Sequence, residues 1–130
     1  MHTQRDAASK MQNQRYQPED RLRSQGDYER VLEHQCKVRG INLLIFGCRN
    51  EVGRPRLGRI VSKRWGNAIV RNRYRRWIRE AFRRVKTELS SIDIVVMPTR
   101  AIVRFSDIET EFLPLAQKLQ ALLSRSMKEG

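Results

Sequence analysis

The sequence predicts a single α+β domain in which one β-sheet is covered by helices. Two observations predict this class. First, 130 residues of which 39% are hydrophobic can close one modest core but not two. Second, segments with a helical hydrophobic period alternate with short apolar runs of strand length. Their order along the chain is helix, two or three strands, helix, strand, helix.

The chain begins with a polar segment that precedes the first predicted helix. Residues 1–20 have no hydrophobic period and are expected to form a mobile tail, followed by one domain over residues 21–126. A helix is predicted from about Ser24 to Gln35, because Ser24 and Asp27 resemble a capping box. Three apolar residues then follow at helical spacing, namely Tyr28, Val31 and Leu32.

Three runs in the middle and late part of the chain are predicted strands. Asn42–Cys48 and Ile92–Met97 are apolar and have the length of a strand, and Leu57–Lys63 is rich in residues that favour strands. Lys37–Arg39 is a possible additional strand. Asn50–Pro55 supplies turn residues between the strands.

A helix is predicted over residues 67–88, and Asn67 is a suitable N-cap for it. Its apolar residues fall on one stripe that should pack on the sheet: Val70, Tyr74, Ile78, Ala81, Phe82, Val85 and Leu89. Trp77 flanks this stripe, and we expect it to belong to the core more readily than to a stacking surface.

The last predicted helix runs from about Asp107 to Ser124, with Ser106 and Glu109 as its capping pair. Pro114 lies inside its apolar pattern. Because proline cannot donate a backbone hydrogen bond, the helix is expected to kink or to restart there.

Positive charge is concentrated in one segment of the chain. The whole sequence has 27 Lys+Arg against 14 Asp+Glu, a net charge of +13, but residues 54–86 hold 13 basic residues and one acid, Glu80. Such a segment repels itself unless it meets a polyanion, and 11 of its 13 basic residues are arginine, whose planar fork fits phosphate. Nucleic acid is the predicted partner. A solvated helix face and a membrane-surface helix are the weaker alternatives.

The basic residues of the predicted helix 67–88 lie opposite its apolar stripe. Six arginines sweep around that side with Asn72 in their midst: Arg71, Arg73, Arg75, Arg76, Arg79 and Arg83. A helix held by its apolar stripe would make them a rigid platform for phosphates, with a steep salt dependence and no reading of sequence. Glu80 is expected to pair with Arg76 or Arg84.

The sequence contains no recognisable set of catalytic side chains for a nuclease. His2 and His34 are far apart, Asp93 and Asp107 stand singly, and no P-loop, HExxH or Cys/His cluster is present. The two cysteines lack CxxC spacing and are expected to be free thiols in a reducing compartment. No apolar run of membrane-spanning length and no secretory leader is seen.

One stretch closely resembles a known family. Residues 63–83, KRWGNAIVRNRYRRWIREAFR, are similar to the RNR signature of the bacterial ribonuclease P protein subunit, and looser similarity extends from Arg21 to the last helix. The resemblance implies the element order αβββαβα, a two-layer sandwich with one mixed sheet, and a left-handed βαβ crossover around the basic helix.

The resemblance also implies a role. A protein of this family is the small cytoplasmic partner of a large catalytic RNA, and together they remove the 5′ leader from precursor tRNA. The RNA performs the chemistry with magnesium that it mainly holds itself. The protein would hold no metal alone and would need no membrane and no obligate protein partner.

The same resemblance assigns residues to this role. Those facing the catalytic RNA would be Lys63, Arg64, Asn67, Arg71, Asn72, Arg73, Arg75, Arg76, Arg79 and Arg83. Those lining a cleft for the leader would be Tyr28, Leu32, Ile60 and Ser62. Stacking on an aromatic ring is worth about 1–3 kcal/mol per base and tolerates any sequence.

Three places depart from the family pattern. Leu32 replaces a usual phenylalanine. Arg59 and Ile60 replace a usual Leu-Ser pair, so either the strand is irregular or the cleft wall is more apolar. After the last strand Thr99-Arg100 replaces Arg-Pro, which leaves a contact from that loop in doubt.

Two other classes of protein stay open on the residues alone. A ribosomal or other general RNA-binding protein would share the charge and the apolar stripe, but it would not need Asn67 and the Arg71-Asn72-Arg73 run. A basic nuclease acting unaided would need the catalytic groups that are missing.

Overall fold

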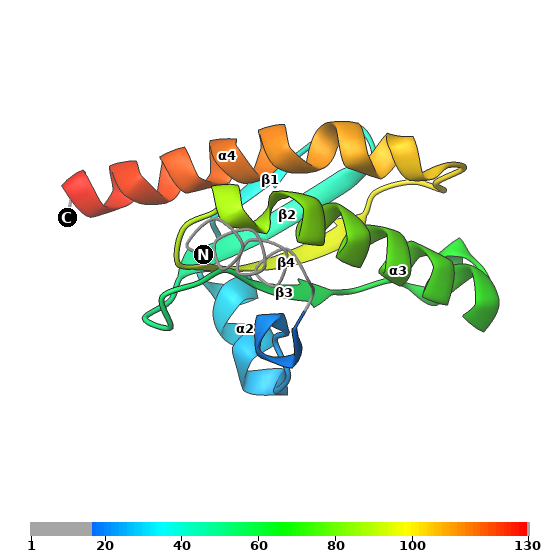
Figure 1. Cartoon of the computed structure of the whole chain (residues 1–130), viewed down its shortest axis with the longest axis horizontal. Coiled ribbons are helices and arrows are strands. Elements are labelled where there is room, and N and C mark those ends of the chain that lie inside the picture. The colour runs from blue at the N-terminus through cyan, green and yellow to red at the C-terminus, as the bar shows by residue number, and fades with distance from the viewer. Residues whose placement is uncertain (1–16, 130) are drawn as a thin grey trace, which may run out of the picture.

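A four-stranded mixed sheet forms the centre of the computed structural model, which describes residues 17–129 (Figure 1). In spatial order the strands are β1 (Lys37–Arg39), β2 (Leu43–Arg49), β4 (Ile92–Pro98) and β3 (Arg56–Arg59). β2 runs antiparallel to both of its neighbours, whereas β3 is parallel to β4. The connection from β3 to β4 is therefore a βαβ crossover. Its left hand, implied by the resemblance, stays a prediction.

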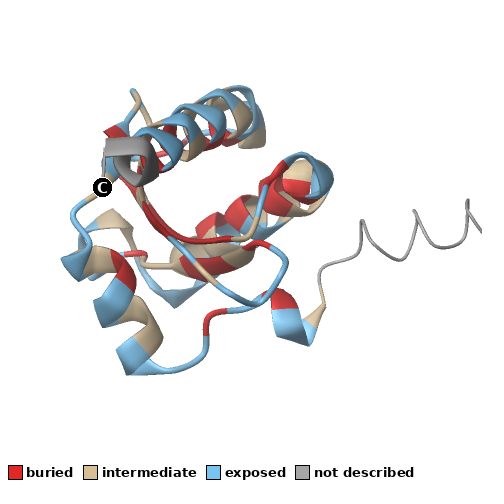
Figure 2. Cartoon of the chain, turned by 90° about the vertical axis from the view of Figure 1, so that its left-hand side faces the viewer, coloured by how far each residue is buried: buried red, intermediate tan, exposed pale blue. Residues whose placement is uncertain are grey.

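Three helices cover the sheet. They are α2 (Gln25–Glu33), α3 (Ala68–Val85) and α4 (Phe105–Glu129). Short 3-10 turns occur at η1 (Pro18–Asp20), η2 (Lys63–Trp65) and η3 (Lys86–Glu88). The predicted class, α+β with the order αβββαβα and one mixed sheet, is confirmed. The helices occupy both faces, however, with α3 and α4 on one face and α2 on the other (Figures 1 and 2).

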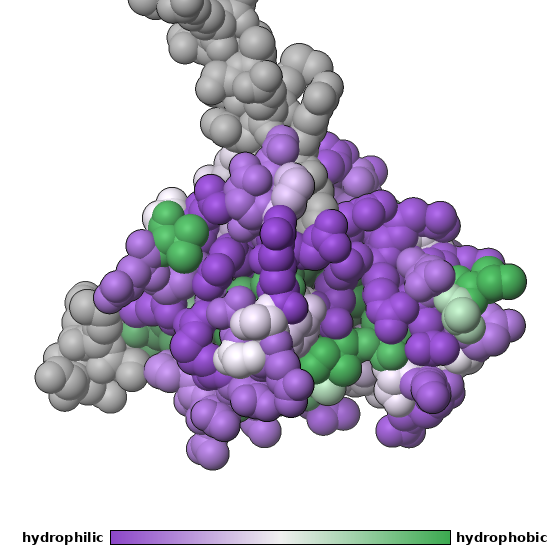
Figure 3. Space-filling view, turned by 90° about the horizontal axis from the view of Figure 1, so that it is seen from below, coloured by the Kyte–Doolittle hydropathy of each residue, from purple (hydrophilic) through white to green (hydrophobic). Residues whose placement is uncertain are grey.

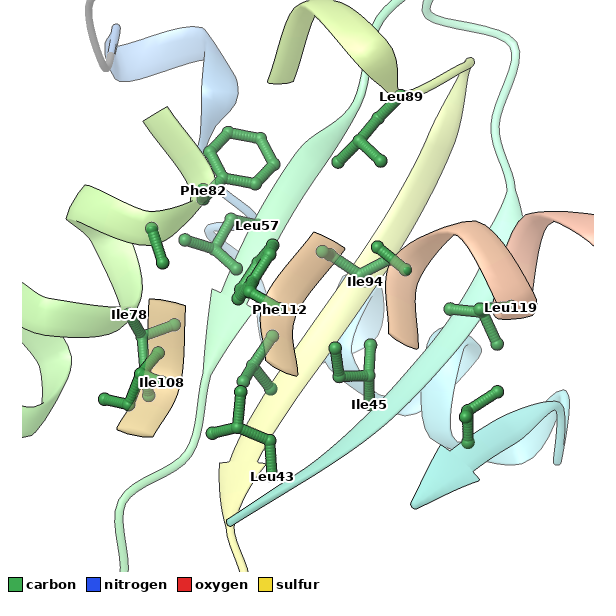
Figure 4. Close-up of a cluster of buried hydrophobic side chains, with 14 of the residues drawn as sticks. Leu43, Ile45, Leu57, Ile78, Phe82, Leu89, Ile94, Ile108, Phe112 and Leu119 are labelled. Carbon is green, nitrogen blue, oxygen red and sulfur yellow. The ribbon is translucent and has the colours of Figure 1, made fainter. Parts of the chain in front are cut away.

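The main core lies between the sheet and the pair α3 and α4. Figure 4 shows side chains from all of these elements meeting in one layer. Phe82 of α3 meets Phe112 of α4 edge to face, with ring centroids 6.5 Å apart. Each fully buried Leu, Ile or Phe contributes about 1.5–3 kcal/mol. Gly47 allows α4 to approach, because a Cβ there would lie 2.4 Å from Leu119 Cδ2.

Two of the three predicted N-caps are confirmed. Ser24 Oγ accepts the N–H of Asp27 at 3.0 Å, and Asn67 Oδ1 accepts the N–H of Val70 at 3.0 Å. The predicted stripe of α3 faces the core: Tyr74, Ile78, Ala81, Phe82 and Leu89 are buried, and Val70 and Val85 are partly buried against them. The local signals therefore place the basic helix correctly.

The predicted strand over residues 57–63 is too long. β3 ends at Arg59, and Lys63 begins the turn η2, where Ser62 Oγ accepts the N–H of Arg64 at 3.3 Å. The predicted helix over residues 67–88 is also too long as an α-helix, because α3 ends at Val85 and continues as the 3-10 turn η3.

The boundaries and cap of the last helix also differ from the prediction. α4 begins at Phe105 and ends at Glu129, so Ser106 lies inside its first turn. Asp107 Oδ2 accepts the N–H of Arg104 at 3.4 Å in place of the expected Ser106 cap. The helix does not restart at Pro114. That residue is on the exposed side, while Phe112 and Ala116 pack on the sheet to either side of it.

The end of the predicted tail belongs to the domain. Asp20 in η1 is 3% exposed and pairs with Lys86 Nζ at 2.8 Å, and Leu22 donates its N–H to the carbonyl of Leu57 at 3.0 Å. These contacts fasten the segment to η3 and β3, so the predicted boundary at residue 21 is too late. Residues 1–16 lie outside the described residues.

The cysteines are free, as predicted. Burial raises the pKa of both thiols, Cys36 and Cys48. No helix within residues 17–129 is long and apolar enough to cross a membrane.

Candidate nucleic-acid interface

The residues predicted to face RNA lie mainly on the outer side of α3 and on the turn before it. We call this surface the basic face. Its exposed residues are Lys63, Arg64, Asn67, Asn72, Arg73, Arg76 and Arg79. Arg73 and Arg76 have no partner within the described part of the chain, so their guanidinium groups are available to phosphate oxygens.

The three remaining residues of that prediction, Arg71, Arg75 and Arg83, are partly buried. Arg71 Nε is buried without a hydrogen-bond partner among the described residues. Arg75 Nη1 donates to Asn72 Oδ1 at 3.0 Å, which orients both side chains.

The basic face is neutralised by acids at its C-terminal end. Arg83 donates through two nitrogens to Glu80, with Nε at 3.0 Å, and Arg84 donates to Glu80 at 3.3 Å and to Glu109 at 2.6 Å. The hydrogen bond from Arg83 outweighs burial and lowers the pKa of the Glu80 carboxyl, so Glu80 stays charged. The expected pairing with Arg84 is confirmed. Arg83 is a further partner, and Arg76 stays exposed.

Trp77 lies between core and surface. It is partly buried against the main core, and its ring stacks on that of Tyr74 at 6.1 Å between centroids. Tyr74 Oη in turn accepts the N–H of Ile102 at 2.8 Å. The aromatic pair therefore anchors α3 to the loop that leads into α4, in agreement with the expected core role of Trp77.

The second face of the sheet carries a small core beneath α2, made of Leu22, Val31, Cys48 and Val95. Around it lies a set of half-buried side chains that we call the apolar patch: Tyr28, Leu32, Phe46, Ile60 and Met97. Figure 3 views this side of the molecule and shows a hydrophobic area among hydrophilic residues. Three of the four residues predicted to line the leader cleft are in this patch. Ser62 is not, because its side chain caps η2.

The strand that departs from the family pattern is regular. The N–H of Ile60 donates to the carbonyl of Val96 at 3.0 Å and so continues the pairing of β3 with β4. Ile60 packs on the α2 side, and Arg59 reaches the α3 side, where its Nη1 donates to the carbonyl of Arg75 at 3.0 Å. The strand is therefore not irregular, and Ile60 adds apolar surface on the α2 side of the sheet.

Tyr28 is held in place from two directions. Its Oη accepts the N–H of Arg59 at 3.1 Å, and its ring lies over Gly58, where a Cβ would be 2.8 Å from the ring. The hydroxyl thus satisfies a backbone donor at the edge strand of the sheet. Glycine at position 58 is required for this close approach of the ring.

Of the two loop residues that follow β4, one is hydrogen-bonded to the backbone and the other is exposed. Thr99 donates its N–H to the carbonyl of Asn42 at 2.9 Å and its hydroxyl to the carbonyl of Ile41 at 2.8 Å, whereas Arg100 is exposed. His34 caps the C-terminal end of α2 and is exposed.

A buried carboxylate ties α2 to the sheet. Asp93 is fully buried and accepts hydrogen bonds from Arg56 Nε and Nη2, both at 2.8 Å, from Asn50 Nδ2 at 2.7 Å, and from Arg30. Burial alone would raise the pKa of Asp93, but hydrogen bonds from Arg56, Arg30 and Asn50 outweigh it and lower the pKa. We call these four residues the Asp93 cluster.

Lowering the pH should reduce the unfolding free energy of the domain, because Asp93 becomes protonated. Its folded-state pKa lies below the unfolded value, so its stabilising contribution is complete above about pH 4 and is lost as the pH falls through the folded-state pKa. In denaturant titrations from pH 7 to pH 3, the difference in unfolding free energy between wild type and Asp93→Asn should shrink as the pH falls. A difference that stays constant down to pH 3 would contradict this role.

Sequence reasoning missed the Asp93 cluster and two members of the apolar patch. Because side chains alternate along the strand Asn42–Cys48, Phe46 must lie on the other face of the sheet from Ile45. This alternation could have predicted Phe46 as a member of the patch. Nothing local pairs Asp93 with Arg30, which is 63 residues away. Among residues 17–129, no group of three or more His, Cys, Asp or Glu side chains is placed to hold a metal ion.

The fold and these surfaces define a class of protein: a single α+β domain with an arginine-rich helix built to meet a polyanion. Comparisons with known proteins make the family definite. The family model for ribonuclease P matches residues 16–126. The chain belongs to the ribonuclease P protein family.

Relatives and solved structures agree. The ribonuclease P protein component of Chromohalobacter salexigens is 37% identical over 71% of this chain and 73% of its own length, and that of Petrotoga mobilis is 30% identical over 85% and 100%. The Staphylococcus aureus RNase P protein aligns with a TM-score of 0.68 at 29% identity, covering 75% of this chain and 92% of its own. The Thermotoga maritima protein aligns with a TM-score of 0.69 at 28% identity, covering 75% and 96%.

Proposed function

We propose that this protein binds the catalytic RNA of ribonuclease P through its basic face and holds the 5′ leader of precursor tRNA on its apolar patch. The observation that carries the proposal is the exposed run of cationic side chains on the outer side of α3. Arg73 and Arg76 in particular are exposed and form no ion pair with an acid among the described residues.

The basic face suits a folded RNA because it is rigid and reads phosphates. α3 is fixed by its buried stripe, so the helix positions from which the arginine side chains extend are set before RNA arrives. Each phosphate neutralised releases counterions, which gives binding a steep dependence on salt and little dependence on sequence. The protein thus orients the RNA without reading its bases.

The chemistry is assigned to the RNA and to magnesium that the RNA mainly holds, with none held by the protein alone. The support is that the carboxylates beside the proposed RNA surfaces already have cationic partners. Glu80 pairs with Arg83 and Arg84, and Asp93 pairs with Arg30 and Arg56. In this proposal the protein acts in the bacterial cytoplasm, without a membrane or an obligate protein partner.

The apolar patch suits a single strand. Tyr28 and Phe46 offer ring surface, and Leu32, Ile60 and Met97 offer apolar surface to bases, which requires no particular sequence. Lys37 Nζ lies 5.7 Å from the centre of the Phe46 ring, so a cation borders the patch. A leader strand would lie across β2, β4 and α2, on the face of the sheet opposite the main core.

The test is a cleavage assay at low magnesium. A bacterial ribonuclease P RNA, a precursor tRNA with a 5′ leader and the full-length protein are mixed, with each component omitted in turn. Cleavage that needs both the RNA and the protein supports the proposal. If the protein adds nothing to the RNA, a ribosomal type of RNA-binding protein is favoured. Cleavage by the protein alone would reveal an autonomous active site.

Removing the Tyr28 ring should weaken binding of precursor tRNA more than binding of mature tRNA. With Tyr28→Ala we expect the holoenzyme to lose about 5- to 150-fold in precursor affinity, the equivalent of one stacked base. Tyr28→Phe separates the ring from its hydroxyl, which bonds Arg59. Equal losses for precursor and mature tRNA would mean that the leader does not contact this ring.

A further inference from the structure

The helix α2 is held on the sheet by few apolar contacts. Of its nine residues, all of them in the described part of the chain, only Val31 is buried. The small core beneath α2 contains four buried side chains, whereas the main core that includes α3 and α4 contains nineteen. A helix of nine residues is marginally stable by itself, so its position depends on contacts with the rest of the domain. Polar contacts therefore matter for where α2 lies.

Arg30 makes a polar contact between α2 and both central strands of the sheet. Its Nη1 donates to Cys48 Sγ of β2 at 3.2 Å, and its Nη2 donates to the carboxylate of Asp93 in β4. Both acceptors are buried, so the guanidinium is anchored on a packed part of the sheet. A third acid, Asp27, lies 3.8 Å from Arg30 but belongs to α2 itself, so that pair does not tie the helix to the sheet.

The apolar patch has two sides that different elements supply. Tyr28 and Leu32 belong to α2, whereas Phe46, Ile60 and Met97 belong to the sheet or directly follow one of its strands. Tyr28 and Leu32 are four residues apart and so lie on the same side of the helix. Any shift of α2 moves these two side chains together relative to the sheet. The position of α2 therefore sets the shape of the patch.

Arg30 is separate from the patch. Two positions along a helix correspond to a rotation of about 200°, so Arg30 leaves α2 on a different side from Tyr28 and Leu32. The other polar link between α2 and the sheet, from Tyr28 Oη to the N–H of Arg59, involves a residue of the patch itself. The Arg30 guanidinium is already bonded to two groups of the sheet. Its effect on a ligand in the patch would therefore pass through the position of α2.

We propose that Arg30 is a positioning residue for the 5′ leader. By bonding Cys48 and Asp93, it holds α2 at the distance from the sheet at which both sides of the apolar patch contact the same strand of RNA. The inference rests on the proposed function, because it takes the leader to lie on this patch. Arg56 offers a matched comparison, since it bonds the same carboxylate from β3 instead of α2.

The first arm of the test measures the position of α2 in the free, full-length protein. Cys48 is 4% exposed beneath α2, so its reaction with iodoacetamide requires the helix to lift; Cys36 is partly exposed and is replaced by serine throughout. Arg30→Gln should speed alkylation of Cys48 by at least about 10-fold, the loss of one hydrogen bond to a charged group. Because Arg30 lowers the pKa of the Cys48 thiol, its removal alone would slow the reaction, so faster alkylation reports access.

Arg56→Gln is the matched control in this arm. Arg56 also bonds Asp93 and also lowers the pKa of the Cys48 thiol, but it belongs to β3. Its side chain is less exposed than that of Arg30, at 20% against 43%, so Arg56→Gln should cost at least as much stability in urea unfolding. It should nevertheless change the alkylation rate by less than about threefold, because local opening of α2 governs that rate. Equal rates for Arg30→Gln and Arg56→Gln would overturn the proposal.

The second arm measures binding of precursor and mature tRNA by the holoenzyme at several salt concentrations. Arg30→Gln should weaken precursor binding about fivefold, which corresponds to α2 being in place in about a fifth of the molecules. Binding of mature tRNA should stay unchanged, and so should the salt slope, because no phosphate contact is lost. Arg30→Lys keeps the charge beside Asp93 and should recover most of the precursor affinity. Arg56→Gln should leave both affinities unchanged despite its cost in stability.

The outcomes separate this role from the alternatives. A salt slope lower by about 0.7 with unchanged alkylation of Cys48 would mean that Arg30 contacts a phosphate directly, and the proposal would be wrong. Equal losses for precursor and mature tRNA would also reject it. If the wild-type holoenzyme binds precursor and mature tRNA equally well, the proposed function fails and the inference fails with it. If the wild type does discriminate and Arg30→Gln discriminates equally well, only the inference fails.

Discussion

Replacing Asp93 with alanine is expected to destabilise the domain by about 3 kcal/mol. The carboxylate is fully buried and joins Arg56 of β3, Arg30 of α2 and Asn50 to β4. Its removal leaves these donors without an acceptor, and Arg56 is only 20% exposed through its side chain. For a domain of this size the loss corresponds to a fall in Tm of about 10–20 °C.

The matched control is Asp27→Asn. Asp27 also lies near Arg30, at 3.8 Å, but its side chain is partly exposed, and the pair is one turn apart on the same helix. Its loss should cost no more than about 0.5 kcal/mol. Thermal and urea unfolding of both variants measure the difference. Similar losses for Asp93→Ala and Asp27→Asn would show that the Asp93 cluster does not hold α2 on the sheet.

Replacing Arg73 and Arg76 together is expected to give the largest loss of RNA binding. Both are exposed on α3 and have no partner in the part of the chain that the structure describes. The double alanine variant should bind the RNA subunit about 100-fold more weakly, at roughly 1.4 kcal/mol for each charged contact. The salt slope should fall by about two if each side chain neutralises one phosphate.

Arg83→Ala provides the matched control on the same helix. Its guanidinium is already bonded to Glu80, so it has less to offer a phosphate. We expect Arg83→Ala to change RNA affinity by less than about threefold, because the Arg83 guanidinium is already occupied by Glu80 and because Glu80 still has Arg84 as a cationic partner in the variant. If Arg83→Ala and Arg73→Ala reduce affinity and salt slope equally, the basic face extends to the end of α3 and the pairing with Glu80 does not limit it.

Much of the fold follows from local patterns. Ser24 and Asn67 cap their helices as predicted, and the stripe that includes Ile78 and Phe82 is buried against the sheet. Errors concentrate at the ends of elements. The sequence predicts that Lys63 ends a strand, but in the structure Lys63 begins the turn η2, because the Ser62 side chain caps that turn. Periodicity signals the middle of an element more strongly than its end.

The functional surfaces were predictable to different degrees. The basic face is local, because Arg73 and Arg76 lie on the same side of a helix whose apolar stripe fixes its orientation. The apolar patch was predicted in part, through Tyr28, Leu32 and Ile60, and on the strength of a family resemblance. Strand alternation alone could have predicted that Phe46 lies on this face of the sheet.

The order of elements, the concentration of charge in residues 54–86 and the family of the chain can all be read from the amino-acid sequence. Which charges meet depends on how the elements pack. Asp93 meets Arg30 across 63 residues, and Lys86 meets Asp20 across 66. Packing also places the Arg30 guanidinium against both Asp93 and Cys48. The reason is physical: helix and strand periods record which face of an element is buried, whereas a charge carries no mark of its distant partner until the elements pack together.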